Sequence, residues 1–314
     1  MDSSVLLSTD ELRVRTGSRE PLDLAVLSGS LLVILGDDTT VAPDLARVLA
    51  GKIPPASGRI LLEDVGIELG SSEARGIVEY VPGNPSFPSG ITLRDHLTMA
   101  AAAAGHRRKR TGEILAQLMS WCSLEEYAGS KVMELPEETR YMAAFAAACL
   151  PVPGILVLQG PFPGELNPLL EDLCQGGASV IACLPGLEHM PQSADRIALC
   201  DARDVRRIVR FGELSEACSS LMRLRVKFFP ALPRAVMESL PGARHVVAVP
   251  GGYEFLHRGL SAAVTNLVNL ARANSRQIAG LEVRSPSISE LVEHFTAEEE
   301  TGEADLFCGE DLDI

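Results

Sequence analysis

Residues 31–51 place a short apolar run, a polar loop and a helical pattern in the order that phosphate-binding sites use. The apolar run 31–35 is typical of a buried parallel strand. The loop Gly36–Ala42 follows, and Pro43 suits the first turn of the next helix. A strand, a loop and a helix in this order can hold a phosphate on the amides of the helix N-terminus.

This loop lacks the groups that phosphate chemistry requires. A loop of the form G-x-x-x-x-G-K-[ST] supplies a second glycine for close backbone approach, a lysine for charge and a hydroxyl for Mg²⁺. Counting from Gly36, these positions hold Val41, Ala42 and Pro43. The two aspartates after Gly36 add negative charge where phosphates would lie. Alone, so loose a pattern also fits any strand–loop–helix.

Composition narrows the class of protein. The chain has 314 residues, enough for two domains, and its net charge of -14 argues against nucleic acid as a partner. Seven cysteines occur without a C-x-x-C pair, so neither a zinc site nor a disulfide framework is predicted. The start of the chain lacks the features of a signal peptide, and no apolar run is long enough for a membrane span. We therefore expect contact with a membrane only through a partner.

The stretch after the loop carries a family resemblance. Residues 36–51, followed by Pro-Ala-Ser-Gly-Arg-Ile at 55–60, resemble the start of an ABC-type ATP-binding domain. The segment 78–97 is similar to the Q-loop block of that family, in which a glutamine senses Mg²⁺ and nucleotide. Gly83 stands at the glutamine position. A Pro/Gly-rich connection between a strand and a helix would give the same composition.

The signature segment of the family aligns with residues 135–150. There, a serine and two glycines let the helix N-terminus reach the γ-phosphate of ATP held by the opposite subunit. Pro136, Glu137 and Glu138 occupy those positions. Proline removes a donor, and the glutamates would repel a triphosphate. The resemblance therefore implies an ordinary helix, which we expect the two glutamates to cap.

Two catalytic positions of the family are also replaced. Residues 155–161 match the Walker B strand. However, Gln159 replaces the Mg²⁺-binding aspartate of the family, and Gly160 replaces the glutamate that polarises water. The position of the histidine that contacts the γ-phosphate holds Pro185. His189, four residues later, is more simply a surface residue than a displaced switch.

The resemblance covers about residues 4–220 and implies an α/β fold. It predicts a P-loop NTPase-like ABC ATPase domain over 1–222, with a mixed sheet and a helical subdomain at about 86–150. Residues 223–296 follow a β-α-β-β-α-β pattern, which predicts a small split βαβ domain. The passage LEVRSPSISELVEHF at 281–295 resembles the end of ATP-binding subunits of the ABC-2 export class. The acidic tail 297–314 is expected to be disordered.

These features predict a catalytically inactive ABC ATPase-like subunit that binds no cofactor and no metal. Its expected partners are an ABC-type transmembrane subunit and an active or like ATPase-fold subunit, at the inner face of the cell membrane. The alternative is a soluble cytoplasmic interaction module that no longer serves transport. An ATPase with a rearranged site is disfavoured, because no lysine follows a Gly-rich loop and Lys52 lies beyond the helix.

Overall fold

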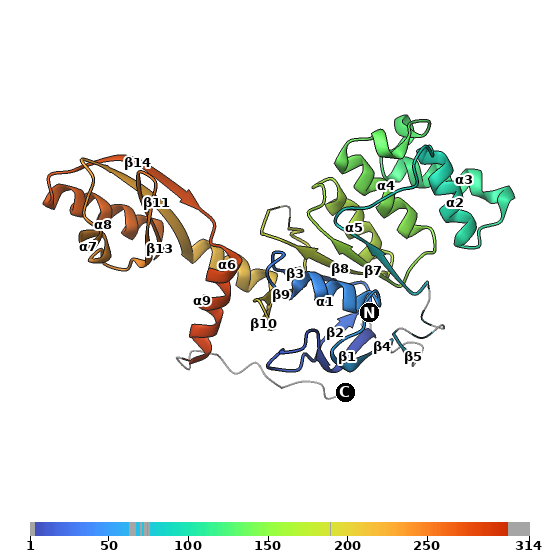
Figure 1. Ribbon diagram of the computed structural model, residues 1–314, viewed down its shortest axis with the longest axis horizontal. Coiled ribbons are helices and arrows are strands. Elements are labelled where there is room, and N and C mark those ends of the chain that lie inside the picture. Colours follow the sequence, from blue (N-terminus) through green and yellow to red (C-terminus); the bar gives the residue numbers. More distant parts are fainter. Residues whose placement is uncertain are drawn as a thin grey trace. The chain divides into compact units, whose positions relative to one another are not determined.

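The computed structural model describes residues 4–62, 67–69, 71, 74, 76–188 and 190–300. The chain divides into two compact units, residues 1–211 and 212–314. The first unit has two sheets and the second has one, each unit has its own hydrophobic core, and each is described by itself (Figure 1).

A six-stranded mixed sheet is the frame of the first unit. Its strand order is β10-β9-β3-β8-β7-β6, and all neighbours are parallel except β9 and β10. The sequence prediction of a buried parallel strand at 31–35 is confirmed, because β3 spans Leu31–Leu35 and lies between β8 and β9. The other strands are β6 (Val78–Val81), β7 (Ile155–Gln159), β8 (Ser179–Leu184), β9 (Arg196–Cys200) and β10 (Val205–Arg210).

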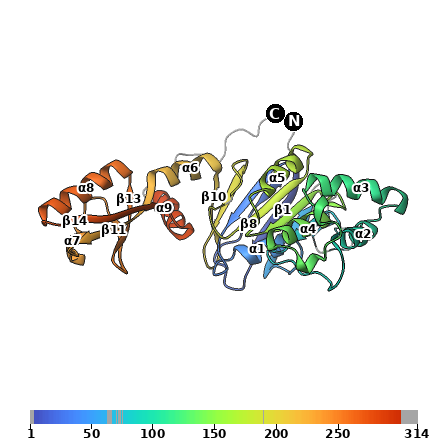
Figure 2. The ribbon, with the colours of Figure 1, turned by 90° about the horizontal axis from the view of Figure 1, so that it is seen from above.

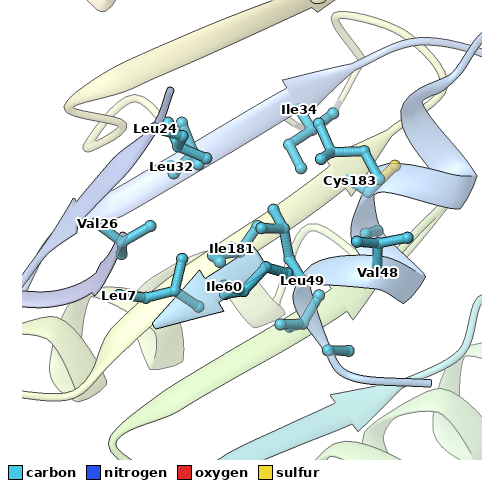
Figure 3. Packing of buried hydrophobic residues seen from close by; sticks show 14 of the residues in the cluster. Leu7, Leu24, Val26, Leu32, Ile34, Val48, Leu49, Ile60, Ile181 and Cys183 are labelled. Carbon is cyan, nitrogen blue, oxygen red and sulfur yellow. The ribbon is translucent and has the colours of Figure 1, made fainter. Parts of the chain in front are cut away.

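A smaller antiparallel sheet joins the same core. Its order is β2-β1-β4-β5, and its strands are β1 (Val5–Arg13), β2 (Ala25–Leu27), β4 (Ser57–Leu62) and β5 (Ile67–Glu68). Helix α1 (Ala42–Leu49) contributes Val48 and Leu49, which pack with Leu7 and Ile60 of this sheet and Ile34 of the large one (Figure 3). The burial of α1 on both sides explains its almost wholly apolar sequence.

Helices cover the rest of the first unit. Helix α2 (Leu93–Ala103) begins at a capping box, in which Thr92 and Asp95 exchange hydrogen bonds. Helices α3 (Arg108–Trp121) and α4 (Glu137–Cys149) complete this helical part, and the short 3₁₀ helices η1 (Glu125–Tyr127) and η2 (Val132–Glu134) connect them. Helix α5 (Leu166–Gln175) packs against β8 (Figure 2).

The second unit is a split βαβ domain. Its sheet has the order β12-β13-β11-β14, and every neighbouring pair is antiparallel. The sequence order of strands and helices is the predicted β-α-β-β-α-β, flanked by α6 and α9. The elements are α6 (Phe211–Ser220), β11 (Leu221–Phe229), α7 (Arg234–Glu238), β12 (Arg244–Val249), β13 (Gly252–Arg258), α8 (Leu260–Ala273), β14 (Gln277–Arg284) and α9 (Ile288–Glu300).

Several boundaries differ from the sequence predictions. The division between the units falls at 211/212 rather than at 222/223, and α6 belongs with the second unit because the N–H of Gly259 bonds to the carbonyl of Ser220. Residues 5–13 form one strand, β1, whose pairing with β4 shifts register between Asp10 and Arg13. Helix α9 extends to Glu300, past the predicted end of the domain at 296, and 301–314 lie outside the described residues. The disorder of the tail stays a prediction.

A strained residue in the turn between α4 and β7 gives a first test. Val152 has φ +55° and its side chain is 81% exposed. A β-branched residue is disfavoured in this left-handed region, whereas asparagine tolerates it. We expect Val152→Asn to raise the free energy of unfolding by about 1 kcal/mol in urea titrations. Val247→Asn, at an exposed strand position, is the control and is expected to give no gain. Equal effects of both substitutions would contradict the strain argument.

Candidate functional site

Both ends of the loop after β3 are held by hydrogen bonds to neighbouring strand ends. The N–H of Gly36 donates to the carbonyl of Leu184, the last residue of β8, at 3.0 Å. The N–H of Val41 donates to the carbonyl of Asp201, just after β9, at 2.8 Å. These bonds fix the loop against the carboxyl ends of two strands, where ligands of open α/β sheets commonly bind.

The amides between these ends bond within the loop itself. The Thr39 N–H donates to the carboxylate Oδ1 of Asp37 at 2.9 Å, and the Thr40 N–H donates to the Asp37 carbonyl at 3.0 Å. The Thr40 hydroxyl donates to the same carbonyl and accepts from the N–H of Ala42 at 3.2 Å. In a phosphate-binding loop, successive amides point together at the anion. Here, the amides of residues 39, 40 and 42 already have acceptors from their own loop.

The side chain of Thr40 also fills the space inside the loop. A Cβ atom added to Gly36 would lie 2.2 Å from the Thr40 Oγ1 and 2.6 Å from the Ala42 Cβ. Such distances are far inside van der Waals contact, so Gly36 is required by the packing of its own loop. The Thr40 side chain therefore lies inside the loop, directly against Gly36.

Asp44, in the first turn of α1, pairs with two arginines. Its carboxylate accepts hydrogen bonds from the guanidinium groups of Arg15 and Arg47. Arg15 lies beyond β1 and also donates to the carbonyl of Ala202 at 3.1 Å. The cations therefore pair with a carboxylate of the first turn of α1. Sequence reasoning missed this cluster, because only the i,i+3 spacing of Asp44 and Arg47 is visible locally.

The two glycines predicted at the Q-loop and Walker B positions approach each other closely. A Cβ atom on Gly83 would lie 2.8 Å from the carbonyl oxygen of Gly160. A Cβ on Gly160 would lie 2.9 Å from Leu184 Cδ2. The Gly160 N–H donates to the Cys183 carbonyl at 2.7 Å. The Gly160 carbonyl therefore occupies the space in which a glutamine side chain at position 83 would begin, and the Leu184 side chain occupies that of a glutamate at position 160.

Gln159 belongs to a network of neutral groups. Its side-chain Oε1 accepts a hydrogen bond from the Tyr80 hydroxyl, and its carbonyl accepts one from the Tyr141 hydroxyl at 2.9 Å. Burial raises the pKa of both tyrosines, so both hydroxyls stay protonated and act as donors. This arrangement positions β6, β7 and α4 without a carboxylate that could hold Mg²⁺.

The remaining predicted site residues lie at strand and helix ends. Pro185 is exposed after β8, and His189 lies outside the described residues. Pro136 precedes α4, whose first turn contains Glu137 and Glu138. The expectation that the glutamates cap this helix is not met by a hydrogen bond, because no side chain bonds the cap and only their charge favours the helix N-terminus.

The structure brings most of these positions to one edge of the large sheet. Gly36, Gly83, Gly160 and Pro185 follow the carboxyl ends of β3, β6, β7 and β8. Tyr141 brings the second turn of α4 to the same edge through its bond to Gln159. In the described part of the chain, no group of three or more His, Cys, Asp or Glu side chains could hold a metal ion. No helix among the described residues is long and apolar enough to cross a membrane.

Comparison with solved structures defines the class of fold. CbiO1 from Clostridium perfringens, part of the ABC transporter complex cbiONQ, aligns with a TM-score of 0.60 at 16% identity, over 68% of this chain and 91% of that one. An ATP-binding subunit of an ABC transporter aligns with a TM-score of 0.59 at 18% identity, over 67% and 92%. The first unit therefore has the ABC ATPase domain fold, as the sequence predicted.

Sequence relatives agree with this class. The daunorubicin/doxorubicin resistance ATP-binding protein DrrA of Streptomyces peucetius is 28% identical over 306 residues, 91% of this chain and 89% of DrrA. The Nod factor export ATP-binding protein I of Rhizobium sp. is 24% identical over 57% of this chain, and the rat cholesterol transporter ABCA5 is 27% identical over 46%. The matches span 62% and 9% of those two relatives. No protein-family model matches the chain.

In sequence and in fold, the chain is therefore similar to ABC transporter ATP-binding subunits.

The contact between the two glycines gives a second test. Gly83→Ala places a methyl group against the Gly160 carbonyl, which cannot move without shifting β7. We expect the free energy of unfolding in urea to fall by about 1–3 kcal/mol. Gly186→Ala is the matched control, because its added Cβ meets nothing within 4 Å. An unchanged stability of Gly83→Ala would mean that this close approach does not exist.

The loop carboxylate gives a third test. Hydrogen bonds from the side chain and backbone of Thr39 lower the pKa of Asp37. The ionised form therefore stabilises the folded state at pH 6, and this contribution is lost as the pH falls through the lowered pKa. Because Asp37 is exposed, we expect Asp37→Asn to cost less than about 1 kcal/mol at pH 6 and clearly less than that at pH 2.

Urea unfolding at the two pH values measures this difference. In a Thr39→Val background, the side-chain donor is gone and the pH-dependent cost of Asp37→Asn should shrink. A cost that is the same at both pH values, or unchanged by Thr39→Val, would contradict the assignment.

Proposed function

We propose that the chain is a catalytically inactive ABC ATPase-like subunit, a pseudo-ATPase that serves as a structural or regulatory partner of an ABC-type membrane complex. One observation carries the proposal: the loop after β3 uses its own acceptors for the amides that would hold phosphate, and Thr40 fills its interior. A nucleotide would have to break these bonds before it could form its own.

Electrostatics supports the same proposal. Ala42 supplies no charge to neutralise phosphate, and the ionised Asp37 would repel it. Gln159 and Gly160 supply no carboxylate for Mg²⁺ or for an attacking water. The degenerate positions are thus spread over the whole site, and no single substitution would restore it. We infer that the protein works without a cofactor or a metal.

The relatives indicate the kind of assembly. DrrA is named for drug resistance and the Nod factor protein for export, and both are ATP-binding proteins. We propose that this chain belongs to the ABC-2 export class and lies in the cytoplasm at the inner face of the membrane. Its partners would be a transmembrane subunit and a second ATPase-fold subunit, of its own or another kind. It would contact the membrane only through them and would bind no nucleic acid.

The segment before α2 is the surface that we assign to the transmembrane subunit. This surface comprises residues 86–97, whose last part is the first turn of α2. The rings of Phe87 and His96 meet edge to face with their centroids 4.9 Å apart, which holds the loop before α2 against the helix. Burial lowers the pKa of His96, and its Nε2 is buried without a hydrogen-bond partner among the described residues. A neutral, partly apolar surface of this kind suits a helix end of a membrane subunit better than it suits a nucleotide.

Titration with nucleotide tests the proposal. Calorimetry of the purified protein with Mg-ATP up to millimolar concentration is expected to give no binding heat, and thermal unfolding is expected not to shift. An active ABC ATP-binding subunit, treated identically, is the positive control. Binding with a dissociation constant below about 1 mM, or phosphate release above background, would contradict the pseudo-ATPase.

Affinity purification from the source organism tests the partner half of the proposal. The tagged full-length chain is expected to retain a transmembrane subunit from detergent-solubilised membranes. Substitution of Phe87 by aspartate should abolish this retention. If the wild-type chain retains neither a transmembrane subunit nor a second ATPase subunit, the result contradicts the proposed role in a membrane complex. It would favour the alternative of a soluble interaction module that no longer serves transport.

A further inference from the structure

The sheet of the second unit ends in two edge strands that differ in how they are protected. The order β12-β13-β11-β14 leaves one side of β12 and one side of β14 without a partner strand among the described residues. Free edges invite pairing with another chain, and bulges or irregular backbone protect against it. On β12, the register shifts between Arg244 and Val247, and His245 has φ +52°. This edge is therefore protected.

The C-terminal half of β14 has no such protection. Its irregularity lies near Ile278, and from Gly280 to Arg284 the strand pairs regularly with β11. Neither proline nor lysine interrupts that stretch. Leu281 and Val283 are apolar residues here, and their side chains are 37% and 47% exposed. An exposed, regular and partly apolar edge is the kind that pairs with a further strand.

The exposed leucine and valine continue a buried row of the core. Val283 lies opposite Leu224 and Leu281 lies opposite Val226, and both β11 residues are fully buried. Directly opposed residues of an antiparallel pair point to the same face of the sheet. The apolar row of the core therefore reaches the sheet edge and ends there uncovered. A strand added to β14 would bury it.

The charges of the same stretch select which strand can be added. Glu282 and Arg284 alternate with the apolar pair and point to the other face. Arg284 lies opposite Arg223 of β11, a like-charged pair, while Arg223 is held by Glu290 of α9. Within its own strand, Arg284 donates to the Glu282 carboxylate at 2.8 Å, and both side chains are half exposed. This bond can be exchanged for bonds between copies if an added strand places a carboxylate opposite Arg284. The strand that offers one at the right place is β14 itself.

Antiparallel pairing about a two-fold axis at Val283 satisfies these requirements together. Residues one position either side of the axis then lie opposite each other, so Glu282 of each copy faces Arg284 of the other. The two Val283 side chains meet at the axis. An axis at Glu282 would instead place the two Glu282 carboxylates together. The sequence of the strand is thus self-complementary in one register.

We propose that the β14 edges of two copies of this chain pair antiparallel about Val283 and join the two four-stranded sheets into one. The contact is isologous, as in most homodimers. It goes beyond the proposed function and does not depend on it, because it involves the second unit alone. The nucleotide titration and the dimer test therefore fail or succeed separately.

Disulfide trapping in the full-length chain tests the register. In Val283→Cys, the two introduced thiols lie opposite each other across the axis, within the Cα separation of about 4.4–6.8 Å that a disulfide bridges. Leu281→Cys is the matched control, because its two copies would be about 14 Å apart along the strands. The wild-type chain, with its seven native cysteines, gives the background. We expect a crosslinked dimer on mild oxidation only for Val283→Cys. Equal crosslinking of both variants, or none, would overturn the proposal.

Charge reversal tests the proposed strand pairing without crosslinking. Glu282→Arg and Arg284→Glu each place like charges opposite each other, and we expect at least about tenfold weaker self-association in sedimentation equilibrium. The double reversal Glu282→Arg/Arg284→Glu restores both pairs and should restore the dimer. Thermal unfolding of dilute samples shows whether each variant remains folded. A monomeric wild-type chain, or a dimer that the single reversals leave intact, would overturn the proposal.

Discussion

The first unit depends on how the backbone amides after β3 find acceptors. A polar backbone group that is removed from water must be paired, and a chain leaving the centre of a parallel sheet has no strand partner of its own. The N–H groups of Gly36 and Val41 donate to the carbonyls of Leu184, at the end of β8, and of Asp201, just after β9. The loop is thereby anchored to both neighbours of β3, and α1 begins at a fixed point beneath the sheet.

Groups of the chain itself, and no ligand, provide hydrogen-bond partners for the loop after β3 and the start of α1. Inside the loop, oxygen atoms of Asp37 and Thr40 accept the hydrogen bonds of the amides of residues 39, 40 and 42. At the start of α1, Arg15 and Arg47 pair with Asp44 rather than with an external anion. These amides and the two arginines therefore have partners within the chain, without a bound phosphate.

Much of the fold could be predicted from local sequence, because it depends on apolar runs and their period. The run at 31–35 and the run at 155–158 became strands of the large sheet, and the alternation in the second unit gave its split βαβ order. Boundaries were less predictable. One register shift makes a single strand of 5–13, and a backbone bond from Gly259 ties α6 to the second unit.

The site was predictable by position but not by geometry. The family resemblance located Gly36, Gly83 and Gly160. The packing of Gly83 against the carbonyl of Gly160 depends on the tertiary structure and could not be predicted from the sequence. Arg15 and Asp44 are 29 positions apart, and no periodicity links them. Thr40 is an ordinary loop residue in the sequence, and its role depends on a turn that brings its hydroxyl under Gly36. Contacts of this kind depend on tertiary packing, which spacing does not encode.

Amide hydrogen exchange at residues 39–42, measured by NMR with and without Mg-ATP, tests the central claim most directly. If the loop supplies its own acceptors, these amides are protected in the free protein, and millimolar Mg-ATP changes neither their exchange rates nor their chemical shifts. Amides that exchange freely in the absence of nucleotide and become protected when it is added would contradict this account, because they would show an open site that waits for phosphate.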